Sequence, residues 1–189
     1  MSFSALIGTA VVIAACGAGN GLTNPASVSN ATRTYSVYAV TGTPNALPAA
    51  YQYSTETLVR PQVLSSGALN FDVAFDLTAD GKVRLLPAKY VVPLPPAGAP
   101  VIGLQKMTAL YEQLVRAPNN GYTLDSAVTA SVGETYTLEL RDSGCSFGEY
   151  FYAKLTIDSV IVSQRRIVVR SLVNRNCGYR SLTEGLPKD

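Results

Sequence analysis

This chain contains short segments in which apolar and polar residues alternate, separated by turn residues. This pattern restricts the possible folds of the chain more than any other feature. Between residues 69 and 77, apolar residues at odd positions alternate with smaller or polar ones (Asn70, Asp72, Ala74 and Asp76). A period of two places successive side chains on opposite faces of a strand, so we expect one buried face and one solvent-exposed face. Residues 78–81 supply a turn with Gly81, and residues 82–86 return as the partner strand.

Similar signals recur along the 189 residues. We expect further strands over residues 34–40, 51–59, 122–130, 134–141, 149–157 and 166–173. Because the connections between them are short, the pairing should be mostly antiparallel. The sequence therefore predicts a mainly β fold: an antiparallel β-sandwich, either immunoglobulin-like or an open barrel.

Two segments between these strands have other patterns. In residues 101–117, Leu104, Met107, Leu110 and Leu114 follow helical spacing, which predicts one short helix near 104–116, although a half-buried strand would also fit. Residues 87–100 hold five of the 11 prolines. Such a run favours polyproline II, and we interpret it as a stiff crossover between two sheets rather than a docking epitope.

The chain begins with a run of 13 uncharged residues, from 3 to 15, followed at once by Cys16. This run is too short to span a bilayer and is typical of the apolar region of a signal peptide. The segment Ile13-Ala14-Ala15-Cys16 resembles the lipobox of bacterial lipoproteins, a resemblance that covers about the first 20 residues. It implies a diacylglycerol thioether on Cys16, removal of the leader before it, and acylation of the new N-terminus.

This resemblance implies anchoring at the periplasmic face of a bacterial cell envelope, because two or more acyl chains hold a protein on a membrane stably. Gly17 after the cysteine favours the outer membrane. Residues 16–33 are rich in Gly, Asn, Ser, Thr and Ala, which indicates a flexible tether. We therefore expect a signal peptide over 1–15, the lipidated cysteine and tether over 16–33, the β-sandwich over 34–182 and a tail over 183–189.

Cys145 and Cys177 remain once Cys16 is set aside, and an even pair in an exported protein predicts a disulfide. Antiparallel pairing of residues 149–157 with 166–173 would bring the two cysteines together at the open end of a hairpin. The turn of that hairpin falls at either 158–159 or 163–165. A redox or metal pair is disfavoured because the chain has no Cys-x-x-Cys motif.

The chain contains no histidine, which excludes Ser-His-Asp and Cys-His catalysis as well as imidazole metal ligands. We expect no cofactor and no metal. The net charge of +2 indicates no bulk attraction to nucleic acid. Basic residues do gather near the C-terminus, where a candidate surface for an acidic partner comprises Arg165, Arg166, Arg170, Arg175, Tyr179 and Arg180.

These observations favour a non-enzymatic, lipid-anchored accessory protein that docks on an envelope or membrane complex. An extrinsic subunit of a photosynthetic reaction centre or a similar assembly would fit this description. The alternative is a periplasmic module that binds a small molecule or a glycan in a tyrosine-lined pocket. A carboxylate-dependent hydrolase is less favoured, since it requires two carboxylates to converge from a small set (Glu139, Asp142, Glu149 and Asp158).

Overall fold

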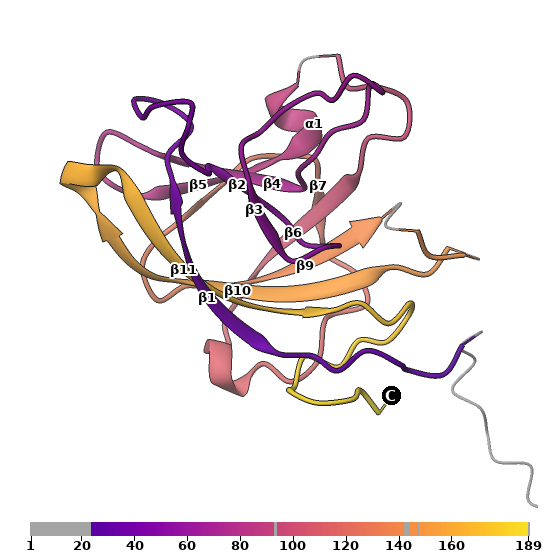
Figure 1. Cartoon of the computed structure of the whole chain (residues 1–189). Helices are drawn as coiled ribbons and strands as arrows, with labels where there is room; N and C mark the ends of the chain where they lie inside the picture. The colour runs from indigo at the N-terminus through magenta and orange to yellow at the C-terminus, as the bar shows by residue number, and fades with distance from the viewer. Residues whose placement is uncertain (1–23, 93, 142–143, 147, 189) are drawn as a thin grey trace, which may run out of the picture.

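The computed structural model describes residues 24–92, 94–141, 144–146 and 148–188, which form two antiparallel sheets packed face to face (Figure 1). The six-stranded sheet has the order β1-β11-β10-β9-β6-β7, and the five-stranded sheet has the order β3-β2-β4-β5-β8. The first sheet comprises β1 (Thr32–Tyr38), β11 (Arg166–Asn174), β10 (Phe151–Ile161), β9 (Thr135–Arg141), β6 (Val101–Met107) and β7 (Thr123–Leu124). The second comprises β3 (Thr57–Val59), β2 (Ala50–Gln52), β4 (Val73–Leu77), β5 (Val83–Pro87) and β8 (Val128–Ala130). The predicted sandwich is confirmed, and the described residues form no closed barrel.

The main core lies between the two sheets and uses alternate positions of their strands. On β9, Tyr136, Leu138 and Leu140 are at most 2% exposed and face the core, where Leu155 of β10 and Phe75 of β4 are completely buried. Full burial of an aliphatic or aromatic side chain contributes roughly 1.5–3 kcal/mol relative to exposure. The alternation read from the sequence of β9 therefore identifies the face that meets the main core, although Thr137 and Glu139 on the other face are buried as well.

The second face of β4 is also buried, which corrects the expectation that it meets solvent. Asp72 and Asp76 are only 6% and 8% exposed. Ala74, on the same face, packs in a second apolar cluster with Ala88 of helix α1 (Ala88–Val91). This helix begins the proline-rich segment, which crosses from β5 in one sheet to β6 in the other, as we expected. The crossover thus covers a face of β4 that would otherwise be exposed to solvent.

Three predicted elements differ in the structure. The single strand predicted over 122–130 is divided into β7 in the six-stranded sheet and β8 in the five-stranded sheet. Residues 101–117 form strand β6 followed by a single 3-10 turn, η1 (Tyr111–Gln113), so the helix predicted near 104–116 is wrong except at that turn. Strand β6 lies between β9 and β7, which satisfy its backbone, and it buries Ile102 and Leu104. The single strand predicted over 51–59 is divided into β2 and β3 by a turn in which Glu56 has a φ of +55°.

A third layer covers the outer face of the six-stranded sheet. It is formed by residues 108–122 and 175–187, whose apolar side chains pack on Tyr152 and Leu172. Lys154 of β10 points into this layer, where its ammonium donates to the backbone oxygens of Tyr111 and Leu114 at 2.9 and 3.0 Å. Burial lowers the pKa of Lys154. Two carbonyl groups of an irregular segment are thus satisfied from the sheet beneath it.

We expect Lys154→Met to lower the free energy of unfolding by about 1–3 kcal/mol, because it leaves two buried carbonyl oxygens without a donor. Chemical denaturation measures this change, and hydrogen exchange should report faster opening of residues 108–117. Lys106→Met is the matched control, since Lys106 is 58% exposed and pairs with Glu134 at the surface. Equal effects of the two substitutions would contradict this role for Lys154.

Candidate functional site

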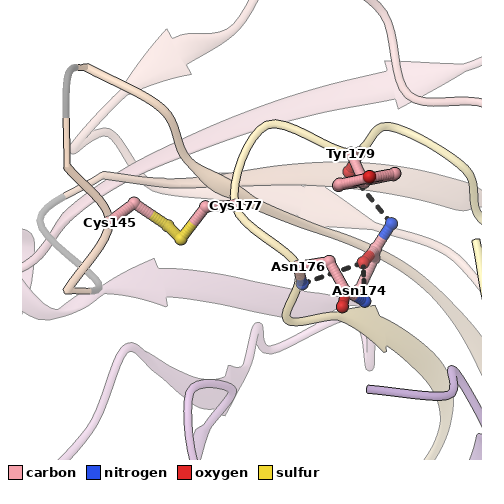
Figure 2. The surroundings of a disulfide bond; sticks show 5 residues. All are labelled: Cys145, Asn174, Asn176, Cys177 and Tyr179. Atoms are coloured by element: carbon pink, nitrogen blue, oxygen red, sulfur yellow. Dashed lines mark hydrogen bonds between the residues drawn. A yellow bond between two sulfur atoms is a disulfide. The ribbon is translucent and has the colours of Figure 1, made fainter. Parts of the chain in front are cut away.

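Cys145 and Cys177 are joined by a disulfide at one end of the sandwich, with a Cα–Cα distance of 5.5 Å (Figure 2). Cys145 lies in the loop between β9 and β10, and Cys177 follows β11. The predicted pairing is confirmed at the open end of the β10–β11 hairpin. Of the two turns considered, the one near residues 163–165 is correct, because the irregularity between Ile157 and Ser159 is a register shift within β10. By the chain-entropy model such a cross-link contributes roughly 3–4 kcal/mol.

Two buried asparagine side chains organise the loop that carries Cys177 (Figure 2). The amide of Asn174 donates to the backbone oxygens of Tyr179 and Ser181, both at 2.9 Å. Its oxygen accepts from the backbone and side-chain nitrogens of Asn176 at 3.0 and 2.8 Å. Because a buried carboxamide needs partners for both its ends, this arrangement fixes the path of the loop.

The same loop holds the first described residues of the chain. The side-chain oxygen of Asn176 accepts from the backbone nitrogens of Ser27 and Val28, and its amide donates to the Val28 oxygen. The Tyr179 hydroxyl accepts from the Ala26 nitrogen at 3.1 Å. We call this set of contacts the N-terminal clamp. Cys16 and residues 1–15 lie outside the described residues, as does the first part of the expected tether.

Because of the clamp, the folded domain begins closer to the N-terminus than residue 34, where we expected it to begin. Of the expected tether, 16–33, the part from Ala26 onward is bonded to the domain. The expected tail, 183–189, is also attached where it is described, because Asn30 and Gly185 exchange two backbone hydrogen bonds at 2.8 and 2.9 Å. Figure 1 shows the two ends of the described chain side by side.

The six residues expected to form an interaction surface are spread along β11 and the loop beyond it. Arg165 lies at the hairpin turn and Arg180 after the opposite end of the strand, and a nine-residue strand spans roughly 30 Å. Three of the arginines form ion pairs within the domain (Arg165 with Asp76, Arg170 with Asp158 and Glu112, and Arg175 with Glu56). Arg180 donates to the Ala117 oxygen, and Arg166 is half-buried at the start of β11. An acidic partner for these residues stays a prediction.

Glu56 connects two segments that are distant in the sequence. Its carboxylate pairs with the guanidinium of Arg33 on β1, and it lies 3.2 Å from Arg175, which follows β11. The side chain of Glu56 is only 10% exposed, although it lies in a turn. Sequence reasoning missed this triad, because Arg33 and Glu56 are 23 positions apart and each residue alone has the pattern of a surface charge.

Three tyrosines lie beside this triad. The rings of Tyr35 and Tyr51 stack with centroids 4.2 Å apart, and Tyr53 meets Tyr51 edge-on at 4.8 Å. The hydroxyl of Tyr51 is buried and has no hydrogen-bond partner among the described residues. Burial and the charge of Glu56 raise the pKa of Tyr51 to about 12. Together with residues 33–34 and 56–58, the two stacked rings line a cavity of about 580 Å³ at one edge of the sandwich.

Asp72 is a second buried charge next to the tyrosines. Its carboxylate accepts from the backbone nitrogen of Tyr53 at 2.6 Å and more weakly from that of Ser54 at 3.4 Å. Burial raises the pKa of Asp72 to about 6, and these two bonds oppose the shift. Because the folded state holds this proton more tightly than the unfolded chain does, ionisation of Asp72 destabilises the fold as pH rises from about 4 to about 6.

Two of the carboxylates considered for a hydrolase, Glu139 and Asp158, lie far apart. Glu139 lies opposite Tyr152 on β10, and Asp158 is six residues farther along the same strand, which corresponds to roughly 20 Å. Asp142 lies outside the described residues, and Glu149 belongs to the loop before β10. Among the residues that the structure describes, no group of three His, Cys, Asp or Glu side chains is placed to hold a metal ion.

Comparison of the chain with models of known families, with curated proteins and with solved structures gives no match. Within the described ranges, the helices are too short to cross a membrane. The clamp, the disulfide and the cavity are therefore the features of the described residues from which a function can be inferred.

We expect Asn176→Ala to release residues 26–28 from the domain, because it removes the acceptor for two backbone nitrogens and the donor to Val28. Hydrogen exchange at Ser27 and Val28 should accelerate, and stability should fall by about 1–3 kcal/mol. Asn70→Ala is the matched control, since the Asn70 side chain bridges Arg60 and Gln62 in another loop. Unchanged protection of residues 26–28 in Asn176→Ala would show that the clamp does not hold them.

We expect Asp72→Asn to raise stability at pH 7 by about 1–3 kcal/mol and to flatten the pH dependence of unfolding between about pH 4 and 7. The amide keeps an acceptor for Tyr53 and carries no charge to desolvate. Thermal unfolding across this pH range provides the measurement. Asp80→Asn, at an exposed turn position, should leave the pH dependence of unfolding unchanged. An unchanged slope in Asp72→Asn would contradict the assignment of this titration to Asp72.

Proposed function

We propose that this chain is a non-catalytic, lipid-anchored accessory protein of the bacterial cell envelope, whose β-sandwich docks on an envelope or membrane complex. The observation that carries the proposal is the N-terminal clamp, which ties residues 26–28 to the loop holding Cys177. A lipid on Cys16 would then pull on one defined end of the sandwich. An extrinsic subunit of a photosynthetic reaction centre or a similar assembly is one example of such a protein.

The clamp leaves nine residues, 17–25, between Cys16 and the first clamped residue. A linker of that length and composition has an r.m.s. span of roughly 15–18 Å, which keeps the domain close to the lipid headgroups. Its disulfide end would then face the membrane. Confinement of this kind raises the effective concentration of a membrane-bound partner, so a modest interface suffices for docking.

The disulfide supports our proposal that the domain lies in an oxidising compartment. Cross-links of this kind persist outside the cytoplasm and are rare within it. The location agrees with the signal peptide and lipobox expected over residues 1–16. The periplasmic side, with the outer membrane favoured by Gly17, is therefore the proposed location.

A small-molecule or glycan-binding module is the second candidate function. The specific observation that favours it is the cavity of about 580 Å³ beside Tyr35 and Tyr51, whose volume falls in the range of ligand pockets.

We expect the wild-type chain expressed in bacteria to incorporate an alkyne-tagged fatty acid, to lack residues 1–15, and to carry a lipid mass on Cys16. Cys16→Ser should abolish incorporation and leave the unprocessed precursor. The control is the double substitution Cys145→Ser and Cys177→Ser, which should keep the label because those thiols are not the acceptors. A lipid-free wild-type chain that still begins at Met1 would refute the anchor.

Docking is tested separately by cross-linking mass spectrometry on intact membranes. The wild-type domain should give reproducible cross-links to one membrane complex and copurify with it in mild detergent. Cys16→Ser should lose these cross-links, because the local concentration falls when the chain leaves the membrane. A lipidated chain that is extracted as a free monomer without neighbours would contradict the docking proposal.

A further inference from the structure

The cavity beside Tyr51 opens at one edge of the sandwich, where β1 ends the six-stranded sheet and β3 ends the five-stranded sheet. Thr34 and Tyr35 contribute from β1, and Thr57 and Leu58 contribute from β3. Its volume of about 580 Å³ is sufficient for a mono- or disaccharide. The wall combines aromatic rings, hydroxyl groups and ionised side chains, which together suit a polar ligand that also has an apolar face.

The Tyr51 hydroxyl is the first sign that a ligand belongs here. The residue is only 2% exposed, and its hydroxyl lacks a hydrogen-bond partner in the part of the chain that the structure describes. Buried hydroxyls in folded proteins are almost always paired, and leaving one unpaired costs free energy. A ligand hydroxyl would satisfy it. Arg33, which pairs with Glu56 and whose side chain is 55% exposed, lines the same cavity.

The charges around the cavity supply the second sign. Arg33, which lines the cavity, and Arg175 behind it both pair with the single carboxylate of Glu56, so this triad carries one positive charge in excess. Glu56 is held there by a backbone with φ of +55°, a conformation that a residue other than glycine adopts at a cost. The surplus favours a ligand with one negative charge, and Glu56 remains available as an acceptor for ligand hydroxyl groups.

We propose that this cavity binds a sugar acid, with its carboxylate on Arg33, one hydroxyl group on Tyr51, and the C–H face of the ring against Tyr35. An inorganic anion would use only the donors and would gain nothing from the aromatic wall. A neutral sugar would leave the surplus charge without a partner. The site goes beyond the proposed anchoring and docking and does not depend on Cys16.

The test uses the full chain purified in detergent, with D-galacturonic acid as the probe and D-galactose as its uncharged counterpart. Saturation-transfer NMR and calorimetry should detect galacturonate with a Kd on the order of 1 mM. Galactose should bind about tenfold more weakly, because it lacks the carboxylate. Absence of galacturonate binding, or equal binding of the two sugars, would overturn the proposal.

Tyr51→Phe separates a binding role from a structural one. It removes only the unpaired hydroxyl, so the melting temperature of the free protein should stay the same or rise, while galacturonate binding weakens about tenfold. Tyr136→Phe is the matched control, because the Tyr136 hydroxyl donates to the Thr129 oxygen at 2.9 Å. That variant should melt about 2–4 °C lower and keep its affinity. Unchanged affinity in Tyr51→Phe would refute the site.

Arg33→Gln tests the charge assignment. The substitution removes the excess positive charge of the triad. The preference for galacturonate over galactose should therefore disappear, while weak binding of both sugars remains. A preserved preference would show that Arg33 does not bind the carboxylate. These outcomes are independent of fatty-acid incorporation at Cys16, so a negative result here leaves the anchor to its own test.

Discussion

The hydrogen bonds of Asn174 and Asn176 hold together parts of the chain that are distant in sequence. Asn174 ends β11 and fixes the path of the following residues, while Asn176 receives the backbone of residues 27–28. The adjacent Cys177 ties this loop to the one before β10. The N-terminal strand, the C-terminal segment and the β9–β10 loop therefore meet at one end of the sandwich.

Local sequence pattern identifies which face of a strand meets the main core, but not whether the other face is covered. In β9, the alternation of Tyr136, Leu138 and Leu140 with polar residues identifies the core side correctly, although Thr137 and Glu139 on the opposite face are also buried. In β4, the same period does not reveal that Asp72 and Asp76 are covered as well. A period of two distinguishes two faces of a strand, but the crossover that covers the second face is a tertiary contact. Residues 101–107 are a second case in which local pattern is insufficient. Their apolar spacing also fits a helix, but pairing with β9 and β7 makes them a strand.

The candidate sites also differ in whether they could be predicted from the sequence. The cysteine pair was predictable because two thiols in an exported chain leave few alternatives. The triad of Arg33, Glu56 and Arg175 was not, because its members come from β1, the β2–β3 turn and the loop after β11. A surface charge and a charge that closes a cavity look identical in a single sequence. Only the packing of the two sheet edges brings these three side chains together.

The clamp and the cavity share one piece of backbone. Arg175 lies between Asn174 and Asn176, so the bonds that fix those asparagines also place its guanidinium beside Glu56. Arg33 lies on β1, whose approach is fixed by the Asn176 contacts with residues 27–28 and by the pairing of Asn30 with Gly185. Both arginines that pair with Glu56 are thus positioned by the loop after β11 and by the residues that precede β1.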